Sequence, residues 1–390
     1  MNCSVNDGVL TVFTEERIDT ANATAVNLEF QKILEENPHT SLVIDAENLK
    51  YISSVGLRIL LGIRKAEKDM KIINAISEVY EIFEMTGFTE IIKVEKAYRK
   101  LSVDGCRIIG QGAKGTVYRY DEDIIIKVYN DSVDLFDIKK ERELAKSAFV
   151  LGIPTAIPYD IVKVGDKFGS VFELLDAQSY SQLIRKDPEN FDKYVKEFAD
   201  LLKLIHSTEI VKDDIPSITV WATKWKNRAL PYFSDEDAQK ISNLLDNIED
   251  RRTMIHGDYH TNNVMLLNGE TILIDMDTLS YGHPIFELAN IFMTLVGFGE
   301  KDASLIEDFL NLPYDTAKQI WEKFIELYLE GEEESKKEEI KENAKFICYL
   351  HLMSHFVHHG DPNLDETKEM IQFYKDKIES RLPQIEKLDF

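Results

Sequence analysis

The chain has 390 residues, its hydrophobic content is 44%, and its formal net charge is −24. The hydrophobic content is ample for packed cores, and the length favours two or three domains. A strongly acidic surface repels nucleic acid and anionic membranes, so we expect neither as a partner.

Cysteine usage and the first residues bear on the compartment. Cys3, Cys106 and Cys348 are far apart and odd in number, which fits a reducing cytosol better than a disulfide framework. The chain starts with neither a basic segment nor an apolar core, so we expect no signal peptide. No apolar run is long enough to span a bilayer. Together these features predict a cytoplasmic protein.

Residues 1–97 alternate strand and helix signals. Runs rich in β-branched residues predict strands at 9–13, 41–46 and 71–75. Apolar residues at helical spacing predict amphipathic helices at 21–37 and 55–68. This pattern indicates a small α/β layer fold with helices on one side. We therefore expect a first domain at residues 1–99.

Residues 42–61, L-V-I-D-A-E-N-L-K-Y-I-S-S-V-G-L-R-I-L-L, combine a hydrophobic strand, a loop and a helix start. A phosphate at a helix start would meet free N–H groups and the positive end of the helix. The segment resembles the STAS domain of anti-sigma factor antagonists, whose D/S-S-x-G-L loop carries a serine that can be phosphorylated. Ser54 takes that position, and Asp19 matches an acidic position near it. The resemblance implies regulation or docking of a protein partner.

Two observations leave an alternative open for this loop. Ser53 stands where the STAS family often has Asp before the phosphorylated serine. Serine is also a common helix N-cap, so Ser53 and Ser54 could both be caps and nothing more.

Residues 108–118, I-I-G-Q-G-A-K-G-T-V-Y, contain the pattern G-x-G-x-x-G-x-V through Gly110, Gly112, Gly115 and Val117. Glycines let a strand–turn–strand close over phosphates, because no Cβ blocks the approach and backbone N–H groups face the anion. Two β-rich runs around an acidic turn follow. They predict a hairpin, whereas a dinucleotide-binding fold would open a helix here.

Lys127 is the only basic residue of the second run, where a lysine can reach nucleotide phosphates. The alternative is an edge-strand lysine that prevents aggregation. Residues 134–150 have helical apolar spacing, and Glu141 or Glu143 could hold the lysine. Only one of them can point inward because they are two apart. Glu143 adjoins an apolar leucine and is our preferred candidate; the alternative for either is a solvated helix charge.

The strings I-H-G-D-Y-H-T-N-N-V-M at 255–265 and I-L-I-D-M-D at 272–277 carry catalytic residue types. Asp258 can orient or deprotonate an attacking hydroxyl. Asn263 and Asp275 offer the oxygen ligands that Mg²⁺ takes when it bridges nucleotide phosphates. The spacing from Asp258 to Asn263 is that of the kinase catalytic loop.

From about residue 104 to 390 the chain resembles the aminoglycoside phosphotransferase and choline kinase family. That family has a protein-kinase-like fold and phosphorylates small molecules. Its G-x-P-x-x-D-L-A segment is present with Glu287 in place of Asp, a carboxylate that the family uses structurally. Gly257 replaces the arginine of the protein-kinase H-R-D, and no A-P-E follows. The family's H-G-D-x-H-x-x-N corresponds to His256, Gly257, Asp258, His260 and Asn263.

The resemblance implies a fold class and a division into lobes. We expect an α/β STAS-like domain followed in the chain by an α+β, bilobal kinase domain at 100–390. Its β-rich N-lobe would lie at about 104–176, and its mainly helical C-lobe at about 177–390.

The resemblance also implies roles. Lys127 would pair with Glu143 and position ATP or GTP. Asp258 would be the catalytic base, and Asn263 and Asp275 would hold Mg²⁺. The remaining implied roles are loop support by His256 and His260, and assistance to the metal or substrate by Asp277.

The segment F-E-L-L-D at 172–176 resembles the hinge strand that receives adenine, which implicates Glu173 and Leu175. An ordinary central strand is the alternative. Further along the chain, His351, His355 and His358 form one stripe at helical spacing, and Trp221 and Trp225 share a face. For these side chains we expect structural packing rather than zinc or substrate binding.

Two classes of function remain. The leading one is a kinase, dependent on ATP and Mg²⁺, of a small hydroxyl-bearing substrate, with a STAS module that regulates or docks it. The alternative is a signalling protein whose kinase-like half phosphorylates a protein serine such as Ser54, or only senses nucleotide. Residues 101–390 carry a net charge of −20. That charge would attract a cationic substrate, although solubility explains it equally and much of it lies at 330–343.

Overall fold

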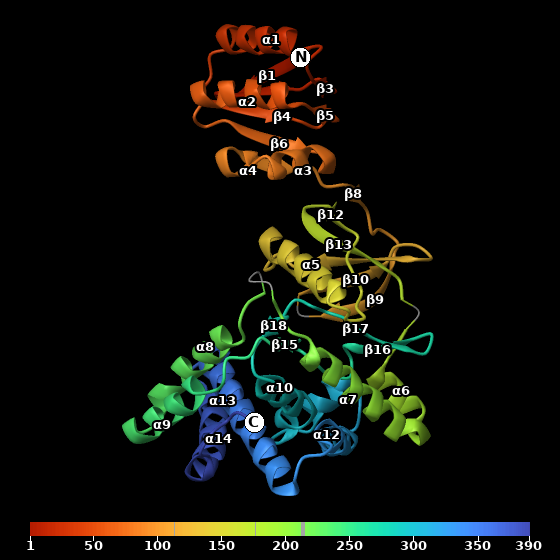
Figure 1. Ribbon diagram of the computed structural model, residues 1–390, viewed down its shortest axis with the longest axis vertical. Coiled ribbons are helices and arrows are strands. Elements are labelled where there is room, and N and C mark those ends of the chain that lie inside the picture. Colours follow the sequence, from red (N-terminus) through yellow and green to blue (C-terminus); the bar gives the residue numbers. More distant parts are fainter. Residues whose placement is uncertain (113, 176, 212–214) are drawn as a thin grey trace. The chain divides into compact units, whose positions relative to one another are not determined.

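The computed structural model describes residues 1–112, 114–175, 177–211 and 215–390. These residues form two compact units (Figure 1), each with its own hydrophobic core. The first unit is Met1–Asp104 with Ile161–Gly169, and the second is Gly105–Asp160 with Ser170–Phe390. The first unit thus extends beyond the expected boundary at residue 99.

The first unit is built on a five-stranded sheet in the order β1-β2-β4-β6-β7. Strand β1 is antiparallel to β2, and the other pairs are parallel. The strands are β1 (Asn2–Asn6), β2 (Val9–Phe13), β4 (Ser41–Asp45), β6 (Lys71–Ala75) and β7 (Lys93–Lys96). The helices are α1 (Ala23–Glu36), α2 (Ser54–Ala66), α3 (Ser77–Met85) and α4 (Phe88–Ile91).

Each parallel pair is joined through at least one helix, because parallel strands need a crossover of this kind. The expected strands are confirmed as β2, β4 and β6, and the two expected helices as α1 and α2. Strand β1 has no apolar alternation to predict it, since its sequence is N-C-S-V-N. Met1–Asp104 also contains three short strands: β3 (Arg17–Ile18), β5 (Tyr51–Ile52) and β8 (Lys100–Leu101).

The second unit begins with an antiparallel meander. It consists of β9 (Arg107–Gly112), β10 (Gly115–Arg119) and β11 (Ile124–Tyr129). Val117 on the central strand lies opposite Gly110 on one side and Lys127 on the other. The predicted hairpin is therefore confirmed. The sheet continues from β11 to β13 (Lys167–Glu173), which is preceded by β12 (Asp160–Val164).

Helix α5 (Leu135–Val150) follows the meander and confirms the expected helix. Its N-cap is Asp134, whose carboxylate accepts the N–H of Asp137 at 2.9 Å. Its buried residues recur every three or four positions, the spacing of one helix face. They are Ile138, Glu141, Leu144, Ala145, Ser147 and Ala148.

The rest of the second unit is mainly helical, as expected. The 26-residue helix α13 (Glu334–His359) packs against α8 (Thr219–Ala229), α10 (Ile285–Leu295) and α14 (Asp365–Arg381), as Figure 1 shows. The other helices are α6 (Tyr180–Lys186), α7 (Phe191–Ser207), α9 (Asp235–Asp246), α11 (Ser304–Leu310) and α12 (Tyr314–Tyr328). Short 3₁₀ turns lie at Pro188–Asn190, Leu230–Tyr232, Gly297–Gly299 and Leu382–Gln384.

Packing explains most of the aromatic and histidine stripe in these helices. Trp225 is buried and stacks on His351, with ring centroids 3.9 Å apart. Trp221 is 46% exposed, with the Lys224 ammonium 4.3 Å from its ring centroid.

In the acidic run at 330–343, Lys337 and Lys341 of α13 both bind Glu326 of α12. The lysines of the run therefore connect α13 to α12 through ion pairs.

Five short strands close the list of elements. They are β14 (Gln178–Ser179), β15 (Met254–Ile255), β16 (Val264–Leu267), β17 (Glu270–Leu273) and β18 (Ser280–Tyr281). Strands β16 and β17 form a hairpin whose turn is Asn268–Gly269, both with positive φ. Two successive positive φ angles are typical of a type I′ turn, for which Asn-Gly is the preferred sequence. Among the described residues, no helix combines the length and the apolar character needed to cross a membrane.

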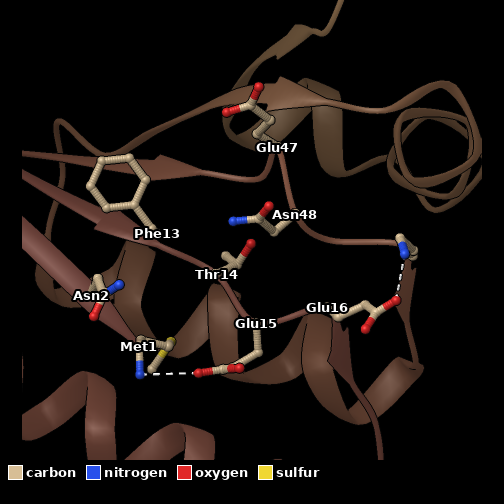
Figure 2. Close-up of a pocket in the computed structure, with 9 residues that line it drawn as sticks. Met1, Asn2, Phe13, Thr14, Glu15, Glu16, Glu47 and Asn48 are labelled. Atoms are coloured by element: carbon tan, nitrogen blue, oxygen red, sulfur yellow. Dashed lines mark hydrogen bonds and ion pairs between the residues drawn. The ribbon is translucent and has the colours of Figure 1, made fainter.

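The first unit also contains a surface pocket of about 470 Å³ (Figure 2). Its lining includes Glu15, Glu16 and Glu47, with Phe13 and Thr14 from the end of β2. The carboxylates of Glu15 and Glu16 are already paired, with the amino group of Met1 and the ammonium of Lys50. None of the residues expected to bind nucleotide or metal lines this pocket.

Candidate active site

Lys127 occupies the middle of β11 and points at two carboxylates. Its Nζ lies 2.9 Å from Oε1 of Glu141 and 3.5 Å from Oδ1 of Asp275. Burial alone would lower the pKa of Lys127, but the charges of Asp275 and Glu141 outweigh it and raise the pKa. The side chain of Lys127 is therefore cationic.

The prediction that Glu143 pairs with Lys127 is wrong. Glu143 is exposed and binds Lys146 one turn later at 3.0 Å. Glu141 is the residue that α5 buries, because it lies three positions after Ile138 and three before Leu144. The apolar neighbour of Glu143 in sequence was a poor guide, since adjacent helix residues point about 100° apart.

Two residues that the sequence did not reveal extend this network beyond Glu141. The buried Tyr129 donates its phenolic hydrogen to Oε2 of Glu141 at 3.0 Å. Its hydroxyl also lies 3.0 Å from Oγ of Ser170 on β13. Tyr129 follows Lys127 by two positions on one strand, so both side chains reach the same face. This period-2 relationship is the only sequence signal that could have found it.

The glycine-rich turn joins β9 to β10. Gly115 is required sterically, because a Cβ there would lie 2.3 Å from the carbonyl oxygen of Val128. At Gly112 a Cβ would meet nothing within 4 Å, and at Gly110 it would only touch Val117 at 3.7 Å. Open space beside the first two glycines is what a ligand needs for close approach to the backbone.

Asp258 lies in the loop before β16, among polar partners. Its Oδ2 accepts Nδ2 of Asn263 at 3.1 Å and lies 3.5 Å from Nε2 of His260. Nδ1 of His260 accepts the backbone N–H of Asn262 at 3.2 Å, so a neutral ring carries its proton on Nε2, facing Asp258. The loop thus presents a carboxylate oriented by two donors.

These donors set the charge of Asp258. Burial raises its pKa, but the bonds from His260 and Asn263 and the nearby His256 outweigh burial and lower it to about 2. The Asp258 side chain is still 43% exposed. An ionised, oriented and accessible carboxylate can accept a hydrogen bond, or a proton, from an incoming hydroxyl.

The backbone of the loop that carries Asp258 is held by Glu287 on α10. This fully buried carboxylate accepts the N–H groups of His256 at 2.5 Å and Gly257 at 3.0 Å. Gly257 has φ +86°, and a Cβ there would lie 2.7 Å from the carbonyl oxygen of Thr278. The structural role expected for the carboxylate at 287 matches this geometry, and Gly257 is a steric requirement.

The β16–β17 hairpin explains why Asn263 and Asp275 converge. Asn263 immediately precedes β16 and Asp275 lies two residues after β17, so both stand at the open end of the hairpin. The N–H of Ile274 donates to the carbonyl of Asn263 at 2.9 Å. Asp275 adopts φ +65°, a left-handed conformation that Asp tolerates and that often marks functional sites.

Asp277 is paired with a residue that the sequence did not single out. The ammonium of Lys114, in the glycine-rich turn, forms an ion pair with Oδ2 of Asp277. Burial raises the pKa of the Asp277 carboxyl, and the neighbouring charge of Asp275 raises it further. Asp275 and Asp277 are thus served by different lysines, Lys127 and Lys114.

The expected hinge segment is partly described. Glu173 ends β13, and its exposed side chain accepts the hydroxyl of Tyr159 at 3.1 Å. The N–H of Leu174 is bound to the carbonyl of Asp123 at 2.7 Å. Leu175 is half-buried, and Asp176 lies outside the described residues. A hinge role for Glu173 and Leu175 remains a prediction.

In the first unit the two serines have different surroundings. Ser53 is the N-cap of α2 and accepts the N–H of Gly56 at 3.4 Å. Ser54 is the first residue of the helix, and it is exposed. The N–H of Ser53 donates to the carbonyl of Ile18. Asp19 therefore directly follows, in the chain, a residue that contacts this loop. Ser54 is therefore accessible and is not the cap.

Fold and site together define a STAS domain that is followed in the chain by a protein-kinase-like phosphotransferase domain. The model of the phosphotransferase enzyme family matches residues 105–324, and that of the STAS domain matches residues 1–101. The first match spans more than half of the chain, so the chain belongs to the phosphotransferase enzyme family.

Individual proteins resemble each part. A Bordetella bronchiseptica protein that bears the name anti-sigma factor antagonist BtrV is 29% identical over 92 residues, which are 23% of this chain and 78% of that protein. The solved structure of ADP-bound aminoglycoside phosphotransferase APH(2'')-Ib is 16% identical, with a TM-score of 0.49 over 80% of this chain and 99% of that chain. A choline/ethanolamine kinase family protein from Mesorhizobium loti is 12% identical, with a TM-score of 0.45 over 73% and 89%.

Proposed function

We propose that the chain is a phosphotransferase that moves the terminal phosphoryl group of ATP or GTP to a hydroxyl of a small molecule. Asp258 orients the acceptor hydroxyl and takes its proton, while Lys127 binds the nucleotide phosphates. The observation that carries the proposal is the environment of Asp258. It is a solvent-accessible carboxylate, kept ionised by two donors, in the loop that leads into the β16–β17 hairpin, whose open end carries Asn263 and Asp275.

The donor set at this hairpin fits Mg²⁺. Asn263 uses its Nδ2 for the carbonyl and carboxylate of Asp258, which leaves its Oδ1 as an acceptor. The side chain of Asp275 is 37% exposed. Within the described ranges, no three His, Cys, Asp or Glu side chains gather into a complete metal site. Mg²⁺ commonly takes one or two carboxylates and completes its shell with phosphate oxygens and water.

The protein's own contribution is positioning and charge. Mg²⁺ held by Asn263 and Asp275 would supply positive charge against the nucleotide phosphates. Lys127 is fixed by Glu141, and that ion pair is buttressed by Tyr129. Asn263 and His260 hold Asp258 toward the acceptor side. Arrangements of this kind accelerate phosphoryl transfer mainly by orientation and electrostatic stabilisation.

The acceptor class is tested with labelled ATP and GTP, supplied alone and with a panel of small hydroxyl compounds. We expect label on a metabolite, and none when Asp258→Asn replaces the wild type. Asp258→Asn should still bind nucleotide in calorimetry, because Asp258 faces the acceptor. Near-normal transfer by Asp258→Asn, or no Mg²⁺-assisted binding of either nucleotide by folded wild-type protein, would refute the proposal.

A second candidate is transfer to a protein serine, and the exposure of Ser54 favours it. Ser54 is free of the capping role that Ser53 performs, so its hydroxyl is available for modification. In this case the STAS domain is itself the acceptor or the docking module for a protein partner. Label that stays on the protein and disappears in Ser54→Ala would support this candidate over the first.

A further inference from the structure

The glycine-rich turn between β9 and β10 carries one charged side chain, Lys114. Its ammonium forms an ion pair with Oδ2 of Asp277, which is 163 positions later in the chain. The turn and the segment after β17 are thereby connected across the site that contains Lys127 and Asp275. None of the roles described above uses this lysine.

The main chain at Lys114 is fixed independently of the side chain. The carbonyl of Lys114 accepts the N–H of Asn130 at 2.9 Å, beside the end of β11. The neighbouring Gly115 packs against the carbonyl of Val128 too closely for any other residue. The Lys114 side chain is 51% exposed. Since lysine has a flexible four-carbon stem, its ammonium can change partner while the turn stays in place.

Asp277 needs a cation near it. Its side chain is only 12% exposed, and it neighbours a second carboxylate, Asp275. A poorly hydrated carboxylate without a counter-charge is costly, and a second carboxylate increases the cost. In the protein alone, Lys114 is the counter-ion of Asp277, and Lys127 is the counter-ion of Asp275. A divalent cation held by the same carboxylates would make both lysines redundant as their counter-ions.

We propose that Lys114 is a phosphate-binding residue, an inference that rests on the proposed phosphotransferase function. Its ammonium leaves Asp277 and binds the terminal phosphate of a nucleoside triphosphate. If Asp275 and Asp277 held a divalent cation, the Lys114 ammonium would no longer be needed as a counter-ion and could bind a phosphate from the glycine-rich turn. Lysine binds phosphate as a compact point charge with three donors. Lys114 therefore contributes most to a ligand that carries the third phosphate.

Calorimetry on the full chain tests the exchange. With Mg²⁺ present, Lys114→Met should weaken ATP binding about tenfold, since a bond between charged groups is typically of that strength. ADP binding should weaken much less, and AMP binding should not change. Lys140→Met, which removes an exposed lysine of α5, is the matched control. If GTP is the nucleotide that the wild type prefers, the same series uses GTP, GDP and GMP.

The outcomes separate this inference from the proposed function. If the wild type binds neither triphosphate, the proposed function fails. If the wild type binds a triphosphate and Lys114→Met binds it equally well, only the present inference fails. A loss of the same size for triphosphate and diphosphate would also overturn it, because the assignment is to the terminal phosphate.

Chemical labelling gives a reading that is independent of any substitution. Lys114 is half exposed, so an amine-directed acylating reagent should modify it in the protein alone. Magnesium and the non-hydrolysed triphosphate analogue of the preferred nucleotide should protect it several-fold, and the diphosphate should protect it less. Lys140 should react equally in all conditions. A Lys114 that reacts equally with and without the triphosphate would contradict the exchange.

Discussion

The phenol of Tyr129 donates to Oε2 of Glu141 at 3.0 Å, while Lys127 binds Oε1 of the same carboxylate at 2.9 Å. One glutamate on α5 is thus held by two side chains of a single strand. Ser170, 3.0 Å from the phenol, extends the network to β13. The position of Lys127 therefore depends on a buried tyrosine that reaches it only through the shared carboxylate of Glu141.

Tyr129→Phe should loosen this arrangement without leaving a cavity. The substitution removes the donor to Oε2 of Glu141, and bonds to charged groups contribute about 1.5 to 3 kcal/mol. We expect a loss of stability of that order and a several-fold weaker affinity for nucleotide. Urea unfolding and calorimetry measure the two effects.

Tyr159→Phe is the matched control, because Tyr159 donates to the exposed Glu173 at 3.1 Å. Exposed bonds of this kind contribute little, so we expect changes within about 0.5 kcal/mol. Equal effects of the two substitutions would show that the Tyr129 network has no special role.

The two glutamates of α5 provide a second comparison. Glu141→Gln removes the charge that binds Lys127 and leaves the lysine with Asp275 at 3.5 Å. Nucleotide affinity and turnover should fall about tenfold or more, because a charge-assisted bond is lost. Glu143→Gln removes an exposed charge that pairs with Lys146 and should leave both quantities unchanged. Titration of both variants with nucleotide decides between the two assignments, and a large effect of Glu143→Gln would contradict the pairing observed here.

The serines at the start of α2 allow a similar test in the STAS domain. Ser53→Ala removes the N-cap of the helix, which typically costs about 1 kcal/mol. For a unit of this size, such a loss lowers the melting temperature by about 4 to 8 °C. Ser54→Ala should change it very little, because Ser54 is exposed and outside the capping bond. Calorimetric melting of the first unit in the full chain checks both. If Ser54 were the N-cap, Ser54→Ala would lower the melting temperature more than Ser53→Ala.

The sequence predicted those parts of the site that are local in the chain. Asn263 and Asp275 converge because the Asn268–Gly269 turn fixes the register of one hairpin. Short-range turn chemistry of this kind is visible in a sequence. The same is true of the glycine-rich turn, where the steric need at Gly115 arises from the adjacent strand.

The parts that were missed depend on tertiary contacts. Choosing Glu141 over Glu143 requires the phase of α5 against the sheet, which two acidic residues on one helix do not reveal. Lys114 and Asp277 are 163 positions apart, so no periodicity connects them. The contact between Tyr129 and Ser170 likewise joins two strands of one sheet. Pairings of this kind become visible only when the fold has brought the segments together.

Acid should destabilise the second unit through histidines whose pKa the fold lowers, of which the partly buried His351 is the best placed for a test. Burial, and then the nearby His355, lower the pKa of His351 to about 3, from 6.5 in the unfolded chain. Below pH 6.5 the unfolded chain binds a proton that the folded protein does not. The unfolding free energy therefore falls as the pH drops from 6.5 toward 3, and His351 contributes no pH dependence above 6.5.

Between pH 7.5 and 5 this single group should account for about 2 kcal/mol of lost stability. His351→Phe keeps an aromatic ring for stacking on Trp225 but cannot bind a proton. Urea unfolding of the second unit at the two pH values should show a smaller acid loss in His351→Phe than in the wild type. The exposed His358, on the same helix, gives the control His358→Phe, which should retain most of the wild-type loss. An unchanged acid loss in His351→Phe would mean that its ring takes up a proton in the folded protein as readily as in the unfolded chain.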